Sequence, residues 1–338
     1  MPAWRPLDEG RSREPDGRGN PGFSLAYPAG EGDLSVFSTG HGIKNLPAEY
    51  RGSFLHAFLD KEVGWRMRPS HDFVWKIDGT SLRYNANKQG FRISNRDSDE
   101  TEGIRVVMLG DSFIWGTGVP YDQTAGQYIE SAFDSLVVYN RAMPGFGVDQ
   151  IRQSLEHWAM PLQPDAVVIG LYTEDFDRSF FAFRNGVNKP TFKLEGARLV
   201  EMTTRDRPGW LLHFLERHSY VFTLGRRVDR WFGLKYGLGS WWALNGAFID
   251  AMQEISGKAN IPILFIHIPW KNGTPFPGLQ SHMKDTNKDF IDLNTQWKSP
   301  KERLSCYFKR DGHLNATGQG FMGRLIIQWL QTKVAATS

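Results

Sequence analysis

Residues 105–116 read Arg-Val-Val-Met-Leu-Gly-Asp-Ser-Phe-Ile-Trp-Gly, an apolar run of strand length that ends abruptly in Gly110-Asp111-Ser112. A serine that follows a strand of an α/β sheet lies at the carboxyl edge, where such folds bind their ligands. Gly110 allows the backbone to turn sharply there, so the Ser112 hydroxyl can point outward instead of being packed. A serine hydroxyl is a weak nucleophile alone. We therefore expect Ser112 to act as a nucleophile only if the chain also supplies a base.

The base is expected from residues 308–318, Phe-Lys-Arg-Asp-Gly-His-Leu-Asn-Ala-Thr-Gly, which precede an amphipathic stretch at 319–333. His313 can accept the Ser112 proton as a general base and later return it to the leaving group. Asp311 can bind the other ring nitrogen of His313, which would fix the tautomer and stabilise the imidazolium. The sequence thus predicts a Ser-His-Asp triad in the chain order Ser, Asp, His.

Strand-like and helix-like segments alternate through most of the chain. Strands are predicted at 104–109, 135–139, 165–171 and 261–268, with a shorter one at 289–293, and helices at 122–134, 148–159, 244–258 and 319–333. Alternation at this spacing predicts a mostly parallel sheet covered by helices on both faces. The expected fold class is therefore α/β, with three layers.

The N-terminal part of the chain predicts additions to this core. Ten of the first thirty residues are Gly or Pro, so residues 1–46 are expected to form a flexible arm. Residues 47–338 are expected to form the α/β domain. Within it, residues 47–100 are expected to pack over the sheet or to border the site as a leader segment.

A second addition is an insertion at 176–243, which contains a predicted hairpin at 191–201 and a Trp-, Phe- and Arg-rich helical stretch at 210–232. Insertions that follow sheet strands commonly form lids and substrate walls. We expect this one to be a lid-like segment, a second small core or an interaction face.

Three short blocks occur in order along residues 85–335. They are Gly110-Asp111-Ser112-Phe113, then Asn-Arg-Ala-Met-Pro-Gly-Phe-Gly at 140–147, then Asp311-Gly312-His313-Leu314-Asn315. In this order they resemble the blocks of the SGNH (GDSL-type) hydrolase family. The resemblance implies a flavodoxin-like α/β/α sandwich, a Ser112 nucleophile, and an oxyanion held by the backbone N–H groups of Ser112 and Gly145. It also implies no metal and no organic cofactor.

The third family block departs from the pattern. After the strand at 165–171 the family has Gly-x-Asn-Asp, whose asparagine donates to the oxyanion, whereas this chain has Tyr-Thr-Glu-Asp with Glu174 at that position. An ionised glutamate can only accept hydrogen bonds, so it would repel a developing oxyanion. Backbone groups could complete the hole, a buried Glu174 could be protonated and donate, or the site could be slow, altered or inactive. Glu174 and Asp175 could also simply pair with Arg178 or Arg184 at the surface.

The triad residues have structural alternatives as well. Ser112 could cap the segment after Gly110, His313 could be a structural residue beside the helix at 319–333, and Asp311 could cap that region. The family usually has two residues between the last Asp and His, whereas only Gly312 intervenes here. Some relatives that resemble polysaccharide O-acetyltransferases share this shorter spacing.

Composition excludes several classes of protein. Hydrophobic residues make up 40% and aromatic residues 13% of 338, so a chain disordered throughout is excluded. A net charge of +3 without a long basic run argues against a nucleic-acid partner. The single cysteine, Cys306, excludes an internal disulfide framework. No apolar run reaches transmembrane length, and no signal peptide is recognisable at Met1, which leaves a cytoplasmic protein or an exported one without its leader as alternatives.

These features together predict a serine esterase that hydrolyses a small acyl ester, with acetyl groups on carbohydrate as a candidate substrate. The short spacing of Asp311 and His313 slightly favours polysaccharide O-acetyl transfer as an alternative. Glu174 motivates a third possibility, a catalytically impaired protein that binds carbohydrate or acts as a scaffold. In each case the expected partner is a small molecule or a carbohydrate.

Overall fold

A computed structural model of the chain describes residues 57–77, 79–93, 103–184, 187–202 and 220–334. The arm predicted at 1–46 lies outside these residues, as do parts of the leader segment at 47–56 and 94–100.

Five parallel strands form the central sheet. They are β5 (Ile104–Leu109), β6 (Leu136–Asn140), β7 (Ala166–Tyr172), β12 (Ile263–Ile268) and β13 (Phe290–Asp292). Their order is β13-β12-β7-β5-β6, with every neighbouring pair parallel. Numbered along the chain, this is the 2-1-3-4-5 order of flavodoxin-like folds. Every residue of β6 and β12 is buried, as expected for parallel strands covered on both faces.

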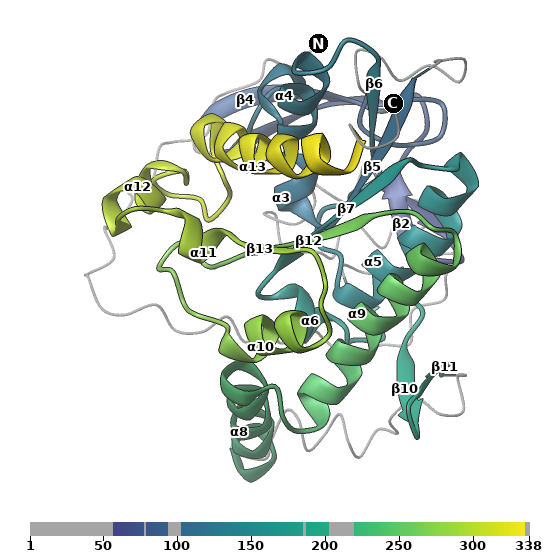
Figure 1. Cartoon of the computed structure of the whole chain (residues 1–338), viewed down its shortest axis with the longest axis vertical. Helices are drawn as coiled ribbons and strands as arrows, with labels where there is room; N and C mark the ends of the chain where they lie inside the picture. The colour runs from purple at the N-terminus through teal and green to yellow at the C-terminus, as the bar shows by residue number, and fades with distance from the viewer. Residues whose placement is uncertain (1–56, 78, 94–102, 185–186, 203–219, 335–338) are drawn as a thin grey trace, which may run out of the picture. The chain divides into compact units, whose positions relative to one another are not determined.

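Helices cover both faces of the sheet (Figure 1). The helices α4 (Ala125–Ser131) and α13 (Ala316–Val334) pack together on one face, and α5 (Val148–Ser154) and α9 (Ser240–Lys258) pack together on the other. The predicted three-layer α/β/α architecture is confirmed, and each predicted strand is found within two residues of its expected bounds.

The predicted helices differ from the observed ones mainly at their ends. The helix expected at 122–134 is divided into a 3₁₀ turn, η2 (Tyr121–Gln123), and α4, because Thr124 is extended and its side chain accepts the N–H of Gln127. The helix expected at 148–159 is α5, continued by a π-helical turn, η3 (Leu155–Ala159), before the 3₁₀ turn η4 (Met160–Leu162). Helices α9 and α13 begin before the residues predicted for them.

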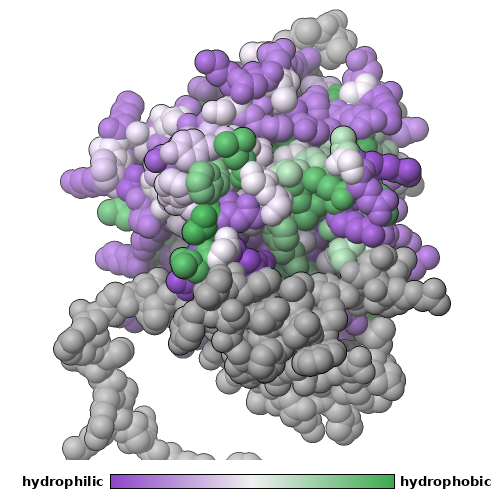
Figure 2. Space-filling view, turned by 90° about the horizontal axis from the view of Figure 1, so that it is seen from below, coloured by the Kyte–Doolittle hydropathy of each residue, from purple (hydrophilic) through white to green (hydrophobic). Residues whose placement is uncertain are grey.

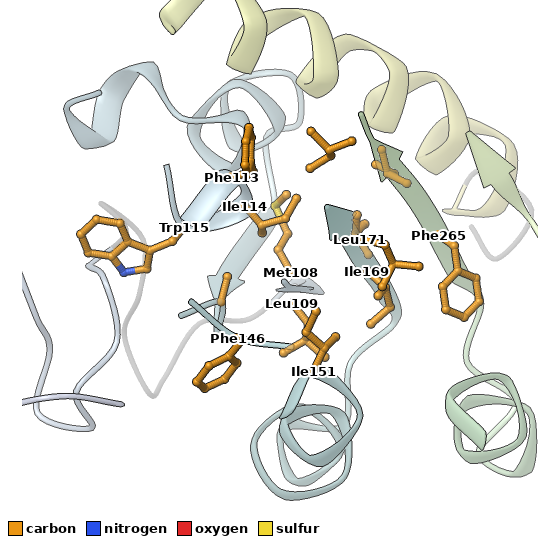
Figure 3. Close-up of a cluster of buried hydrophobic side chains, with 14 of the residues drawn as sticks. Met108, Leu109, Phe113, Ile114, Trp115, Phe146, Ile151, Ile169, Leu171 and Phe265 are labelled. Atoms are coloured by element: carbon orange, nitrogen blue, oxygen red, sulfur yellow. The ribbon is translucent and has the colours of Figure 1, made fainter. Parts of the chain in front are cut away.

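A short helix, α3 (Ser112–Trp115), packs directly onto the sheet. Its Ile114 is fully buried, and Figure 3 shows this side chain beside Met108 of β5. A Cβ on Gly170 of β7 would lie 2.2 Å from Cγ1 of Ile114. Glycine at position 170 therefore lets α3, which begins with Ser112, approach the carboxyl edge of the sheet.

The leader segment forms two antiparallel hairpins. Strand β1 (Ala57–Asp60) pairs with β2 (Gly64–Met67), and β3 (Asp72–Ile77) pairs with β4 (Thr80–Asn85). The sequence does not predict either hairpin. Strand β3 does carry a period-two signal, because Phe73 and Ile77 are buried whereas the intervening Val74 and Lys76 are exposed.

The insertion contains the predicted hairpin. Strand β10 (Phe192–Glu195) pairs antiparallel with β11 (Arg198–Glu201), and a short ladder of β8 (Phe183–Arg184) and β9 (Val187–Asn188) precedes it. Of the helix predicted at 210–232, residues 210–219 lie outside the described part; α8 (Tyr220–Tyr236) covers the rest of it and continues four residues further.

The remaining helices are short: α6 (Asp175–Arg178), α10 (Pro277–Asp285), α11 (Leu293–Gln296) and α12 (Pro300–Ser305). In the described ranges, none of the helices is both long enough and apolar enough to cross a membrane.

Candidate active site

Ser112 is the first residue of α3, directly after the end of β5. Gly110 has φ +156°, and a Cβ there would lie 2.6 Å from Cγ1 of Ile114 and 3.0 Å from the carbonyl oxygen of Gly170. The turn therefore requires glycine. The helix cap is Asp111, whose side chain accepts the N–H of Phe113 at 2.9 Å. The alternative that Ser112 caps this segment is therefore wrong, and its hydroxyl is left for other contacts.

His313 reaches Ser112 from the opposite end of the chain. The distance from His313 Nε2 to Ser112 Oγ is 2.7 Å, and that from His313 Nδ1 to Asp311 Oδ1 is 2.5 Å. Because an ionised carboxylate can only accept, Nδ1 carries the proton and Nε2 presents its lone pair to the serine hydroxyl. The hydroxyl also lies 3.3 Å from Asp111 Oδ2, a longer contact than the one to His313.

Asp311 orients His313 and does not cap the following helix, where Asn315 Oδ1 accepts the N–H of Gly318. Oδ1 of Asp311 accepts the backbone N–H of His313 at 2.8 Å and also faces the imidazole. Burial of Asp311 raises its pKa, but the hydrogen bonds and charge of His313 outweigh this and hold the pKa below its usual value. A spacing of one intervening residue is thus sufficient for the Asp–His contact, since the turn at Gly312 brings both groups together.

Two sets of contacts fix His313: those within its own loop, and those of the helix α13 that follows the loop. An isolated β-bridge joins Tyr307 to Leu314, and the N–H of Phe308 donates to the carbonyl of His313 at 3.0 Å. Gln319, fully buried in α13, donates from Nε2 to the carbonyl of Phe113 at 2.8 Å and accepts the N–H of Ala125 at 3.0 Å. This amide connects α13 directly to α3 and α4.

Gly145 lies in the loop after β6 and has φ +85°, a conformation that favours glycine. Asn140 anchors the start of the loop, because its side chain donates to the carbonyl of Ile114 and accepts the N–H of Ala142. The carbonyl of Gly145 accepts Nε of Arg184 at 3.0 Å. Within the described ranges, neither the N–H of Ser112 nor that of Gly145 donates a hydrogen bond to another residue.

The leader segment contacts the loops on either side of Ser112. Trp65 Nε1 donates to the carbonyl of Pro144 at 3.2 Å, and Tyr84 Oη accepts the N–H of Gly118 at 2.9 Å. Arg92 is buried and donates to the carbonyls of Trp115, Gly116 and Val119. Burial lowers the pKa of Arg92 to about 10, although the nearby Tyr84 opposes this.

Glu174 and Asp175 occupy different environments. The Glu174 side chain is 51% exposed, and its Oε2 lies 3.6 Å from Nη2 of Arg178. Glu174 is therefore not buried, although the alternative of a donating Glu174 requires burial. Asp175 is fully buried: it accepts the N–H of Tyr172 at 2.9 Å and Nη1 of Arg178 at 2.6 Å. Pairing with Arg178 is confirmed for Asp175, but inside the protein and not at the surface.

Arg178 is a site residue that the sequence does not assign. Its Nη1 donates to Asp111 Oδ2 at 2.9 Å and to the carbonyl of Phe146 at 3.0 Å, in addition to Asp175. Burial opposes its charged form, but Asp175 and Asp111 together raise its pKa above the usual value. Burial first, and then the charge of Asp111, raise the pKa of Asp175 well above its usual value. The spacing of Asp175 and Arg178 on one helical turn signals their pairing, whereas nothing in the sequence signals the contact with Asp111.

Comparison with known proteins gives structural neighbours only. No family model matches the chain, and no curated protein matches it. The chain is similar in structure to an acetyl xylan esterase (14% identity, TM-score 0.41), covering 67% of this chain and 100% of that one. It is also similar to a GDSL-like lipase from Bacteroides thetaiotaomicron, with 13% identity and a TM-score of 0.39, over 68% of this chain and 88% of that one. A lipase/acylhydrolase from Enterococcus faecalis is similar with 14% identity and a TM-score of 0.40, over 68% of this chain and 96% of that one.

Because these identities and TM-scores are low, we assign the fold from the order of the five parallel strands in this chain and not from the neighbours. That order places Ser112, His313 and Asp311, hydrogen-bonded in series, at the carboxyl edge of a flavodoxin-like parallel sheet.

Proposed function

We propose that the protein is a serine esterase of the SGNH type that hydrolyses a small acyl ester, with acetyl groups on carbohydrate as the substrate class. One observation carries the proposal: the hydrogen-bonded series from Ser112 Oγ through His313 to Asp311, with contacts of 2.7 and 2.5 Å. In this arrangement the imidazole is oriented by a carboxylate and its free lone pair faces a hydroxyl, which is the geometry that activates a serine.

In the proposed mechanism, Ser112 Oγ attacks the ester carbonyl carbon while its proton passes to Nε2 of His313. The resulting oxyanion is bound by the N–H groups of Ser112 and Gly145. Collapse of this intermediate breaks the bond to the alcohol oxygen, which takes the proton from His313, and leaves an acyl-serine. Water, deprotonated by His313, then attacks the acyl-serine and releases the acid and the free Ser112 hydroxyl. Asp311 remains ionised throughout and stabilises the imidazolium.

Glu174 sets a limit on the rate in this proposal. The family's asparagine would donate a third hydrogen bond to the oxyanion, and loss of one such donor costs on the order of 10²–10³-fold in turnover. The Glu174 carboxylate is half-exposed and lies beside the Arg178 guanidinium, so solvent and this cation reduce its repulsion of the oxyanion. We therefore propose an active enzyme whose hole has two backbone donors.

The nucleophile is tested with 4-nitrophenyl acetate and longer acyl esters, on the wild type, Ser112→Ala and the matched control Ser131→Ala, an exposed serine on α4. We expect Ser112→Ala to lower kcat by on the order of 10⁶-fold, to the background rate, and Ser131→Ala to retain activity. The chain-length profile of the wild type would measure the acyl pocket. Equal background rates in all three proteins would refute the esterase proposal.

The hole is tested by Glu174→Asn, with Glu174→Gln as the variant that removes the charge but keeps the length. A rise of roughly 10-fold or more in kcat for Glu174→Asn alone would identify a missing side-chain donor. A similar rise in kcat in both variants would instead show that the negative charge of Glu174 lowers the rate. No hydrolysis in any form, including the wild type, would favour a carbohydrate-binding protein without activity.

O-acetyl transfer is the second candidate, favoured by the single residue between Asp311 and His313. The same acyl-serine would then be attacked by a sugar hydroxyl instead of water. Mass spectrometry of oligosaccharides incubated with the protein and 4-nitrophenyl acetate distinguishes the two. Formation of acetylated sugar by the wild type but not by Ser112→Ala would identify acetyl transfer.

A further inference from the structure

Helix α8 (Tyr220–Tyr236) exposes most of the large apolar side chains that the structure describes on it, whereas Leu234 packs against the core. Five large hydrophobic residues of this helix are at least 41% exposed: Leu224, Val228, Trp231, Phe232 and Tyr236. At 100° per residue, all of them except Tyr236 fall within one arc of about 100° of the helix surface. Leu238, just past the helix end, is 60% exposed. The apolar stripe of a surface helix usually faces the core, so this exposed group of apolar side chains is unusual.

The opposite side of α8 is fixed to the protein. A Cβ on Gly233 would lie 2.3 Å from Cε3 of Trp241, so α8 and α9 are in close contact there. Nε of Arg230 contacts both carboxylate oxygens of Asp177 at 2.8 Å, and the Arg230 guanidinium lies 5.2 Å from the ring of Trp270. The helix is thus held by its inward residues, and its orientation directs the apolar arc outward.

Cations outnumber acidic residues on α8, and all of the cations except the inward-facing Arg230 are exposed. The helix carries three arginines and one lysine but a single acidic residue, Asp229. Asp229 is directed toward α9, where it accepts Ser240 Oγ and the N–H of Trp241. Lys235 Nζ lies 4.9 Å from the ring of Trp231 and 5.0 Å from that of Tyr236. In the view of Figure 2, hydrophobic side chains gather on this side of the molecule, between hydrophilic ones.

We propose that α8 is a docking helix for an anionic lipid surface. The arc contains Trp231, with Lys235 inside it, and Arg227 and Tyr236 lie just beyond its two borders. Apolar and aromatic side chains combined with Lys and Arg are typical of helices that lie in the plane of a membrane interface. There the aromatic rings occupy the headgroup level and the cations meet anionic headgroups. The positive charge of the helix selects this partner over a second copy of the chain, because two α8 helices would bring like charges together.

Two sets of variants test this proposal by flotation with vesicles of phosphatidylcholine alone or mixed with phosphatidylglycerol. The apolar variant is L224E/V228E/W231E, and the charge variant is R227E/K235E. The matched control, V74E/L304E, changes residues that are 60% and 49% exposed on β3 and α12. Circular dichroism and thermal unfolding of each variant check that it remains folded. R227E/K235E keeps the apolar side chains of the arc, so it tests the proposal even if L224E/V228E/W231E does not fold.

We expect the wild type and the control to bind the mixed vesicles, and binding to neutral vesicles to be at least 10-fold weaker. The apolar variant should lose binding to both. The charge variant should lose at least roughly fivefold for each cation removed toward the mixed vesicles, and more because each glutamate adds a repulsive charge, but little toward the neutral ones. Equal binding to both vesicle types would overturn the anionic specificity. Absence of wild-type binding would overturn the proposal, and a wild-type dimer in light scattering that L224E/V228E/W231E dissociates would identify a second copy as the partner.

Discussion

Replacement of Arg178 by methionine should destabilise the protein far more than loss of an ordinary arginine. The side chain is 10% exposed and is the shared cation of Asp111 and Asp175, which are 1% and 0% exposed. It also donates to the carbonyl of Phe146 at 3.0 Å. Removing one member of a buried ion pair costs about 3–5 kcal/mol, because the remaining charge is left uncompensated. Two carboxylates lose their partner here, so we expect a value at the upper end of this range near neutral pH.

The cost should fall as the pH is lowered. Burial already raises the pKa of Asp175 well above its usual value in the presence of Arg178, and loss of the cation raises it further. In the variant, native Asp175 therefore binds a proton at a pH where the unfolded chain does not. Because the native state then holds more protons than the unfolded state, stability increases as the pH falls toward the ordinary carboxyl pKa.

The measurement is urea-induced unfolding at pH 7.5 and pH 5, followed by circular dichroism and by tryptophan fluorescence to check that the transition is two-state. Arg198→Met, at an exposed position on β11, is the matched control and should cost less than about 0.5 kcal/mol. Arg178→Lys keeps the charge without the planar fork and should be intermediate. A cost for Arg178→Met equal to that of the control, or one that is independent of pH, would refute the reasoning.

Three further predictions concern the triad and the turn that carries it. Asp311→Asn should lower kcat for 4-nitrophenyl acetate by on the order of 10²–10⁴-fold with a small change in KM, because His313 loses the carboxylate that stabilises its imidazolium; an unchanged kcat would exclude this role. Gly110→Ala should lower the free energy of unfolding by about 1–3 kcal/mol, since the added Cβ would meet Ile114 at 2.6 Å and the Gly170 carbonyl at 3.0 Å, and urea unfolding would detect it. The lowered pKa of Asp311 means that its stabilisation is present above the unfolded-state pKa and is lost as the pH falls through the native one. Thermal unfolding from pH 6 to pH 2.5 should therefore show a smaller loss of stability at the acid end for Asp311→Asn than for the wild type.

The parallel sheet is predictable from this sequence because its strands are buried on both faces. Strands β5 and β12 are short, nearly continuous apolar runs followed by Gly110 and Pro269 respectively, and such runs are recognisable without knowledge of the fold. The leader hairpins are less so, because β3 alternates over only six residues and its exposed positions include the apolar Val74. Its inward side is defined by packing against Trp115, which follows it by some forty residues and leaves no local signal.

The contacts around the candidate site divide in the same way. The Asp311–His313 pair is local, so its spacing predicts the contact. The contact of Arg178 with Asp111 joins residues 67 positions apart and depends on how α6 packs beside α3. The outward apolar face of α8 is also not predictable, since an amphipathic helix ordinarily buries that face. The tertiary contacts of Gly233 with Trp241 and of Arg230 with Asp177 show which side is attached.

The buried amide of Gln319 has a consequence for how the protein is made. It joins α13 to the carbonyl of Phe113 across 206 positions, and the neighbouring Ser112–His313 contact spans 201. Contacts of such separation form late, because the intervening chain must be ordered first. While the ribosome is still adding residues beyond α12, the nascent chain can form β5 and its turn but has no imidazole beside Ser112. A nascent chain arrested before residue 313 should therefore hold an unactivated serine, and reactivity toward fluorophosphonate probes should appear only after α13 has left the exit tunnel.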